Sequence, residues 1–365
     1  MTLSLIVLST EHWDSKRQAR KELLYKALTK SGHVRYLAYV EPMAYWWRKD
    51  FRTWQYQDGL VHIYKWRCPF PGERYFPVLS ANRFYQALKI RRILPQSPNK
   101  LFGIFYHPTN WLVAKKVRFN GPWIFDWTDD WGVYHHSGRI ARLQIESIRD
   151  CDGVVTVSQT FFERAKDIRG DNKVLHLANA TDLRAFNGLE EPIELKKIKH
   201  PRIGFMGHLG PWVDVTMIKQ VARRFPDYQW CILGHAPSLL KDEMEVFPNI
   251  HFFGVQDYFS MPKWMMFMDI LAAPYIQSEL GIDASKIYDY LTSGKPIISS
   301  SNDTISGFSG LIEIADTIED WERAIRKCLQ EKESHRAQLR KDASADHTWT
   351  NRAQKLSEWL NKSYS

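Results

Sequence analysis

The sequence has few cysteines and no long apolar run. Its 365 residues include four cysteines, which lie far apart and form no C-x-x-C pair. This argues against a disulfide framework or zinc site and indicates reduced thiols in the cytosol. No stretch reaches the roughly 18 apolar residues that cross a bilayer. The opening MTLSLIVLST lacks the basic region and longer apolar run of a signal peptide. We therefore expect a cytoplasmic protein whose membrane contacts are peripheral, on the inner face of the plasma membrane.

A glycine-rich G-x-G-x-x-G loop is also missing, which argues against a dinucleotide enzyme. Acidic residues are scarce in residues 1–100, which hold 7 aspartates and glutamates against 18 lysines and arginines. The net charge of the whole chain is +9, so the remainder is close to neutral. This one-sided charge predicts a polyanionic partner or an anionic surface for the first part of the chain.

The order of apolar runs predicts an α/β protein with two doubly wound domains. A chain of 365 residues exceeds what one hydrophobic core usually supports. Strand and helix patterns alternate from residue 3 and then restart at residue 202, as two Rossmann-like halves would. We expect an N-terminal domain over 1–187, a charged linker over 188–200, a second domain over 201–345 and a C-terminal helix over 346–365.

The stretch 269–300 predicts a site for a nucleotide diphosphate. It contains a strand, a polar loop, a short helix from Ser285, a stop at Gly294 and a second strand. The N–H groups of a helix start, with Lys286 beside them, suit a diphosphate. Asp289 lies on the same helix face and can accept hydrogen bonds from ribose hydroxyls. The alternative is an ordinary amphipathic helix followed by a core strand.

Three aspartates, Asp126, Asp129 and Asp130, fall at the end of the predicted strand 123–127. Mutual repulsion among such carboxylates can raise the pKa of one of them toward the range of a general base. We expect at least one to act in catalysis. The alternative is that Asp129 or Asp130 caps a helix and that Asp126 is a turn residue.

Other polar residues follow predicted strands of the first domain, where doubly wound sheets gather their ligands. His12, Trp13 and Arg17 follow the first strand, and His107 ends the strand at 101–106. We expect these four side chains to bind a ligand.

Aromatic residues and arginines alternate over residues 43–92 without a clean helical or strand period. Such a mixture suits the membrane–water interface, with aromatic rings at the level of anionic headgroups. It would also suit single-stranded nucleic acid, and the simplest alternative is irregular surface packing of arginine on tryptophan. We expect an anionic membrane surface to be the partner.

Several motifs resemble those of the GT-B group 1 glycosyltransferases, in particular enzymes of capsule, teichuronic acid and exopolysaccharide synthesis. Residues 286–297 (KIYDYLTSGKPI) resemble K-x-x-E-Y/A-L-A-x-G-x-P-V, with Asp289 in place of glutamate. Residues 125–131 (FDWTDDW) resemble Y-D-x-x-D-D-W/L, and residues 203–214 resemble I-G-Y-x-G-x-x-x-x-x-x-D. The start of the chain resembles the L-S-x-x-x-W-x-x-x-x-Q-R opening of capsule and teichuronic acid enzymes.

The resemblance implies a GT-B fold in which two Rossmann-like domains face a cleft and the C-terminal helix crosses back to the first domain. It implies transfer of a sugar from a nucleotide diphosphate sugar, UDP favoured, to a glycan or polyprenyl-diphosphate-linked acceptor, with no metal or other cofactor. The literal D-x-D at 150–152 precedes a predicted strand, so we read it as a helix end. The implied donor-binding residues are Gly207, His208, Tyr275, Glu279, Asp283, Ser285, Lys286 and Asp289. The implied acceptor-binding residues are His12, Trp13, Arg17 and His107.

The sequence leaves alternatives open. Group 1 enzymes mostly retain the anomeric configuration, whereas the xanthan-type glucuronosyltransferases, which this chain also resembles, invert it with a cleft aspartate. The chain could also be a GT-B sugar-nucleotide epimerase, a sugar-binding homologue without activity, or a protein that binds single-stranded nucleic acid.

Overall fold

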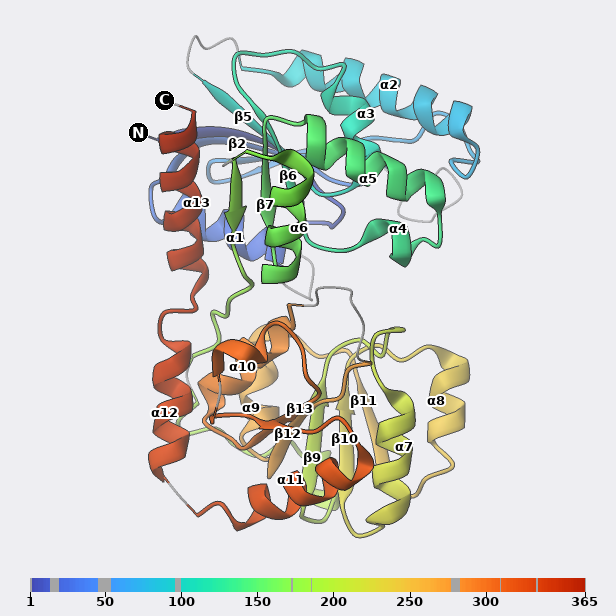
Figure 1. Ribbon diagram of the computed structural model, residues 1–365, viewed down its shortest axis with the longest axis vertical. Coiled ribbons are helices and arrows are strands. Elements are labelled where there is room, and N and C mark those ends of the chain that lie inside the picture. The colour runs from blue at the N-terminus through green and yellow to red at the C-terminus, as the bar shows by residue number, and fades with distance from the viewer. Residues whose placement is uncertain are drawn as a thin grey trace. The chain divides into compact units, whose positions relative to one another are not determined.

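The computed structural model describes residues 2–13, 20–44, 54–95, 100–171, 173–184, 186–276, 283–308, 310–332 and 334–364. The chain forms two compact units, each built on its own sheet (Figure 1). The first unit combines Met1–Ala178 with Trp349–Ser365, and the second is Asn179–Thr348.

The sheet of the first unit has eight strands in the order β3-β4-β2-β1-β5-β6-β7-β8. All neighbours are parallel except the antiparallel pair β3 and β4. The strands are β1 (Leu3–Leu8), β2 (Val34–Val40), β3 (Trp54–Asp58), β4 (Val61–Lys65), β5 (Leu101–Phe105), β6 (Trp123–Trp127), β7 (Gly153–Thr156) and β8 (Val174–His176).

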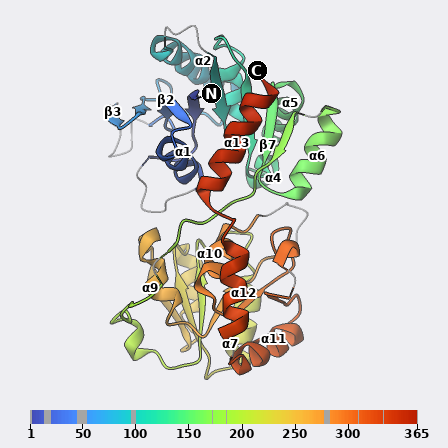
Figure 2. The same ribbon diagram turned by 90° about the vertical axis from the view of Figure 1, so that its left-hand side faces the viewer.

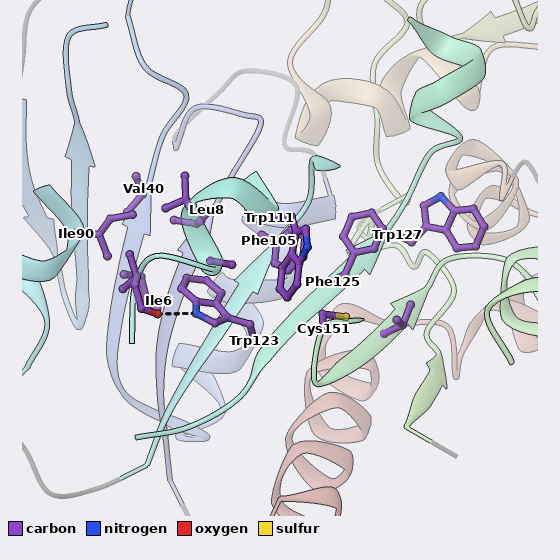
Figure 3. Close-up of a cluster of buried hydrophobic side chains, with 14 of the residues drawn as sticks. Ile6, Leu8, Val40, Ile90, Phe105, Trp111, Trp123, Phe125, Trp127 and Cys151 are labelled. Carbon is purple, nitrogen blue, oxygen red and sulfur yellow. Dashed lines mark hydrogen bonds between the residues drawn. The ribbon is translucent and has the colours of Figure 1, made fainter. Parts of the chain in front are cut away.

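One face of this sheet packs against an aromatic-rich core. Successive strand residues point to opposite faces, so Phe105, Trp123 and Phe125 join one cluster with residues of the covering helices (Figure 3). The indole Nε1 of Trp123 donates to the carbonyl of Val117 at 3.1 Å, which satisfies its buried N–H. Besides the C-terminal helix, the first unit contains the helices α1 (Arg20–Lys30), α2 (Phe76–Ile93), α3 (Trp111–Ala114), α4 (Trp131–Tyr134), α5 (Gly138–Asp150) and α6 (Gln159–Arg169).

The C-terminal helix α13 (Trp349–Ser363) belongs to the first unit and packs beside α1 (Figure 2). Its Leu356 and Leu360 are buried. Gly153 at the start of β7 makes the close approach possible, because a Cβ there would lie 2.1 Å from the hydroxyl oxygen of Tyr364. The expected return of the C-terminal helix to the first domain is confirmed.

The second unit has a six-stranded, fully parallel sheet in the order β11-β10-β9-β12-β13-β14. This is the doubly wound Rossmann order, in which the chain changes direction between β9 and β12 and ligands bind at the carboxyl ends of the strands there. The strands are β9 (Arg202–Met206), β10 (Gln229–Leu233), β11 (Ile250–Gly254), β12 (Ile270–Ala273), β13 (Ile297–Ser299) and β14 (Glu313–Ile314). The helices are α7 (Val215–Arg224), α8 (Ser238–Met244), α9 (Met261–Met265), α10 (Ser285–Ser293), α11 (Ile318–Gln330) and α12 (Ser334–Ser344).

The two parallel sheets and most strand positions agree with the sequence prediction, but the region 43–92 differs. It contains the β3–β4 hairpin and the 18-residue helix α2. The inner face of α2 carries Asn82 and Gln86 beside Leu79 and Ile90, so polar residues interrupt its apolar period. None of the helices in the described ranges is long and apolar enough to cross a membrane.

A buried ion pair joins α12 to the end of α11. The Arg340 side chain is 1% exposed and the Glu331 side chain 7%. The guanidinium donates to both carboxylate oxygens of Glu331 at 2.6 Å. It also donates to the carbonyls of Gly294 and Leu311. Because Gly294 ends α10, the hydrogen bond from Arg340 to its carbonyl fixes the C-terminal end of that helix.

The variant Glu331→Gln should lower the free energy of unfolding by about 3–5 kcal/mol, because it leaves the buried Arg340 cation without its counter-charge. A urea melt followed by circular dichroism measures this. The matched control is Glu322→Gln, whose partners Arg224 and Arg326 are both exposed, and it should leave the melt unchanged. Equal melts of the two variants would contradict the assigned role of the buried pair.

Candidate functional site

The ammonium group of Lys286 lies at the switch point of the second sheet. Its Nζ atom is 3.9 Å from the ring centroid of Phe205, near the end of β9, and 5.0 Å from that of Tyr275, just after β12. Within the described residues no carboxylate pairs with it. Among the residues that the structure describes, the lysine is therefore held by aromatic rings and has no counter-charge.

The backbone beside this lysine is shaped by two glycines. Gly207, after β9, has φ +143°, and a Cβ there would lie 3.0 Å from the Nζ atom of Lys286. Gly234, after β10, has φ +135°, and its Cβ would lie 2.0 Å from the carbonyl oxygen of Gly207. Only residues without a Cβ allow the two loops and the lysine to come this close.

Burial lowers the pKa of Lys286 to about 7, because its ammonium form loses solvation without gaining an anion. The helix α10 starts beside it, with Ala284 as an N-cap that makes no side-chain hydrogen bond. The first N–H groups of α10 and the ammonium are thus both available to an anionic ligand. The exposed Ser285 is the first residue of this helix.

Asp289 lies one turn further along α10. Its Oδ1 atom accepts from the hydroxyl of Tyr258 at 2.9 Å, and the hydroxyl of Thr181 also donates to the carboxylate. Burial raises the pKa of Asp289 to about 7, against these two hydrogen bonds. An ionised carboxylate has about four acceptor positions, so capacity remains for a ligand hydroxyl.

Asp283 is tied into the second unit. Its Oδ1 atom accepts from the hydroxyls of Tyr288 at 2.9 Å and Thr304 at 2.8 Å. Its Oδ2 atom accepts from the backbone N–H of Asn179, whose side chain donates to the Asp283 carbonyl at 3.0 Å. These bonds fix the segment that enters α10.

The remaining predicted donor residues are distributed as follows. His208 stacks on His235 with ring centroids 5.0 Å apart, and its Nδ1 atom is 3.0 Å from the carbonyl oxygen of that residue. Tyr275 is buried, with its ring facing Lys286. Glu279 lies outside the described residues.

In the first unit Asp126 is buried in the sheet. Its side chain is 2% exposed, and Arg20 of α1 donates to its Oδ1 atom at 3.3 Å. Burial raises the pKa of Asp126, while Arg20 and a hydrogen bond from Tyr106 oppose the rise. The carboxylate therefore already has two partners within the unit.

The other two predicted acids differ from each other. Asp130 caps α4 by accepting from the N–H of Val133, and Gln144 and Arg164 both donate to its carboxylate at 3.0 Å. Asp129 is exposed, and its carboxylate accepts from the hydroxyl of Thr128 at 2.8 Å. Asp129 is the most accessible of the three acids.

His107 follows β5, and its ring is fixed in a cluster. Its Nδ1 atom accepts from the N–H of Thr109, and its Nε2 atom lies 3.1 Å from that of His135. Its ring meets Trp131 edge-on at 4.7 Å. Burial, with positive neighbours, lowers the pKa of His107 to about 3, so this imidazole stays neutral near pH 7.

His12 and Trp13 follow β1, and both are held by Glu41, the residue after β2. The Oε2 atom of Glu41 lies 2.9 Å from Nδ1 of His12, and its Oε1 atom accepts from the N–H of Trp13 at 2.8 Å. The indole of Trp13 donates to Asp58 at 3.1 Å. Arg17 lies outside the described residues.

Four partners of the site residues were not predicted from the sequence: Glu41, Arg20, Phe205 and Gly234. Glu41 could have been found, because carboxyl ends of neighbouring parallel strands lie at one edge of a sheet. Among the described residues, no group of three or more histidines, cysteines, aspartates and glutamates could hold a metal ion.

The variant Gly234→Ala should disrupt the turns beside Lys286, because its methyl group cannot occupy space 2.0 Å from the Gly207 carbonyl oxygen. We expect Gly234→Ala to lower the free energy of unfolding by more than about 3 kcal/mol. This is more than the same substitution costs at a left-handed glycine with open space around it. The control is Gly254→Ala at φ +68°, where nothing lies within 4 Å of the new Cβ, and which should cost about 1–2 kcal/mol. Thermal melts of both variants measure the difference, and equal losses would contradict the close approach.

Comparisons with known proteins agree with this architecture. No protein-family model matches the sequence. The chain is 24% identical over 175 residues to the teichuronic acid biosynthesis glycosyltransferase TuaH of Bacillus subtilis (strain 168). That match spans 44% of this chain and 43% of the relative, so it covers less than half of the relative's length.

Solved structures match over nearly the whole chain. A sucrose-phosphate synthase of Thermosynechococcus elongatus is 12% identical, with a TM-score of 0.75 and 99% of each chain covered. The trehalose-6-phosphate synthase OtsA is 9% identical, with a TM-score of 0.76 and coverage of 98% of this chain and 99% of that one. Anabaena HepE in complex with UDP-glucose is 12% identical, with a TM-score of 0.69 and coverage of 99% and 100%. The chain therefore has the GT-B fold, as the motifs of the group 1 glycosyltransferases predicted.

Proposed function

We propose that the chain is a glycosyltransferase that moves a sugar from a UDP-sugar to a glycan or lipid-linked acceptor in surface polysaccharide synthesis. One observation carries the proposal: Lys286 holds an ammonium group at the switch point of the second sheet, and no carboxylate of the described residues pairs with it. A cation desolvated in this way gains most from a ligand that brings negative charge. A nucleotide diphosphate supplies that charge.

In this proposal the second unit binds the donor. Lys286 meets the diphosphate together with the first N–H groups of α10, and the loop at Gly207 lets the phosphates approach the backbone. Asp289 accepts from the ribose hydroxyls, while Ser285, His208 and Tyr275 line the donor site. Glu279 and Asp283 complete the predicted set, with Asp283 acting on the entry to α10. HepE, a structural neighbour, is known in complex with UDP-glucose, which supports UDP as the nucleotide.

The transfer step needs stabilisation of the negative charge that develops on the leaving diphosphate. Lys286 and the start of α10 are fixed before the reaction, so they provide that stabilisation without reorganisation. This arrangement requires no metal ion, and we propose that the reaction proceeds without one.

We propose that the first unit binds the acceptor through Trp13, Arg17 and His107, with His12 beside them. Asp126, Asp129 and Asp130 are the predicted acids of this unit. We expect the exposed carboxylate of Asp129 to position the acceptor hydroxyl. Asp126 and Asp130 act indirectly, through the side chains that are hydrogen-bonded to them. The likeness to TuaH supports a surface-polymer acceptor, either a glycan or a polyprenyl-diphosphate-linked sugar.

The variant Lys286→Met should weaken the binding of UDP by about 1.5–3 kcal/mol, the range for a hydrogen bond to a charged group. The affinity of the unmodified protein should fall as the pH rises from 7 to 9. Without a ligand, Lys286 has a pKa of about 7. Above that pH, an anion that needs the ammonium form must bind together with a proton. Isothermal titration calorimetry measures both effects.

Lys286→Arg is the matched control, because a guanidinium keeps its charge throughout this pH range. It should retain UDP binding with little change between pH 7 and 9. An unchanged affinity in Lys286→Met would contradict the donor-site assignment. A protein that binds UDP but transfers no sugar to any acceptor would instead be a sugar-binding homologue.

We also propose that the first unit contacts an anionic membrane surface through α2, within the region 43–92. Phe84 is 49% and Leu88 39% exposed on this helix, and Arg91 and Arg92 are exposed near its end. Lys116 lies 5.5 Å over the ring of Phe84. Apolar side chains with basic neighbours are the composition of a helix that lies at a membrane surface.

Replacing Lys89, Arg91 and Arg92 together by glutamine should reduce binding to vesicles that contain anionic phosphatidylglycerol. Each basic residue near such a surface contributes about 1 kcal/mol, so partitioning should fall by roughly two orders of magnitude. Co-sedimentation with these vesicles measures it, with phosphatidylcholine vesicles as a reference. The matched control replaces Arg323, Arg326 and Lys327 of α11 by glutamine and should bind the vesicles as the unmodified protein does. Equal binding by both triple variants would contradict a membrane-binding role for α2.

A further inference from the structure

Two hydroxyl groups from distant parts of the sequence meet at the carboxylate of Asp289. Tyr258 follows β11, and its hydroxyl donates to the Oδ1 atom of Asp289 at 2.9 Å. Thr181 lies near the start of the second unit, and its hydroxyl donates to the same carboxylate. All three residues belong to Asn179–Thr348, so the arrangement is complete within one unit.

The backbone fixes the direction of both hydroxyl protons. A hydroxyl group has one proton to donate and two lone pairs that accept. The hydroxyl oxygen of Thr181 accepts from the N–H of Leu183 at 3.1 Å, and that of Tyr258 accepts from the N–H of Asp182 at 3.4 Å. Because these N–H groups occupy the acceptor side of each hydroxyl, its proton is directed to the carboxylate.

The segments that carry the two hydroxyls are themselves held in place. The N–H of Thr181 donates to the carbonyl of His347 at 3.0 Å, beside a bridge between Thr181 and Thr348. Tyr258 begins a short 3-10 helix, which Asp257 caps by accepting from a backbone N–H. Donors supported in this way are oriented before a ligand binds.

The carboxylate of Asp289 has capacity for two further hydrogen bonds. An ionised carboxylate offers about four acceptor positions. Within the described ranges of the chain, Thr181 and Tyr258 are the side chains that donate to it. Asp289 is also partly exposed, so a ligand can reach it. The remaining capacity matches the two neighbouring hydroxyls of a ribose.

Asp283, at the entry to the same helix, is bonded differently. Its carboxylate accepts from the hydroxyls of Tyr288 and Thr304 and from the N–H of Asn179. Three donors from the protein leave this carboxylate little capacity for a ligand. Of the two acids, Asp289 is therefore the one that can meet ligand hydroxyls.

We propose that Thr181 and Tyr258 are positioning residues, which aim the Asp289 carboxylate at the ribose hydroxyls and thereby make the site selective for ribonucleotides; this inference rests on the proposed glycosyltransferase function. Asp289 is one methylene group shorter than the glutamate of the group 1 motif, so it reaches less far and depends more on its orientation. A 2′-deoxyribonucleotide would leave one acceptor position of the carboxylate empty after water has been displaced, which lowers its affinity.

Calorimetric titration with UDP and with 2′-deoxy-UDP measures this selectivity. Both nucleotides carry the same diphosphate, so the contribution of Lys286 cancels in the ratio of their dissociation constants. The unmodified protein should bind UDP roughly 10–100 times more tightly, the range for one hydrogen bond to a charged group. Asp289→Ala should bring the ratio close to 1.

Tyr258→Phe and Thr181→Val each remove one donor hydroxyl and nearly preserve the shape of the side chain. Each should lower the ratio by at least about threefold, because the carboxylate is no longer held toward the ribose. Thr181→Ser keeps a hydroxyl and should retain the ratio of the unmodified protein. The control for a general loss of stability is Tyr290→Phe, which removes a buried hydroxyl that accepts from the N–H of Met206. It should change both affinities equally and leave the ratio unchanged.

A second measurement does not depend on binding. Burial, with the nearby Asp182, raises the pKa of Asp289 to about 7, while the hydrogen bonds from Thr181 and Tyr258 oppose the rise. Tyr258→Phe should therefore raise the pKa of Asp289 further, because hydrogen bonds to the ionised form lower a pKa. A pH titration of the carboxyl ¹³C resonance measures this, and an unchanged pKa would overturn the assigned role of Tyr258.

The outcomes separate this inference from the proposed function. Equal affinities for UDP and 2′-deoxy-UDP in the unmodified protein would overturn the inference and leave the transferase intact. An unchanged ratio in both Tyr258→Phe and Thr181→Val would do the same, since the two residues would then support only the fold. If the unmodified protein binds neither nucleotide, the proposed function fails and the inference fails with it.

Discussion

The second unit's site depends on a cation that pairs with no carboxylate of the described part of the chain. Lys286 is surrounded by the rings of Phe205 and Tyr275 and by a glycine backbone that leaves just enough room for it. Ring faces attract an ammonium group, but they return only part of the solvation energy that burial removes. The folded protein therefore carries an electrostatic deficit at this position, and an anionic ligand is the natural way to relieve it.

Most of the fold could be predicted because the strands of parallel sheets have a clear apolar pattern in the sequence. The runs at 3–8, 34–40, 123–127 and 202–206 are buried on both faces and read as continuous apolar stretches, and the structure has strands at these positions. Helix α2 escaped detection because Asn82 and Gln86 occupy its buried face. Polar residues with specific partners cannot be recognised from periodicity.

The positions of the site residues could be predicted from the sequence, but most of their hydrogen-bond partners could not. Lys286 and Gly207 were identified from a helix start and a turn, and the structure brings them together. The partners of the acids were not visible, since Arg20 is 106 residues away from Asp126 in the chain. The Asp129 carboxylate accepts only from its neighbour Thr128 among the bonds described above, whereas Asp283 also accepts from Asn179, which is 104 residues away in the chain.

The first unit is assembled from both ends of the chain, since α13 covers part of a sheet whose strands lie before residue 178. During synthesis the ribosome releases the whole second unit before residues 349–363 emerge. Until then, the surface that receives Leu356 and Leu360 is exposed in the nascent chain. The second unit is contiguous and can fold first, so the order of folding is opposite to the order in which the two sheets begin.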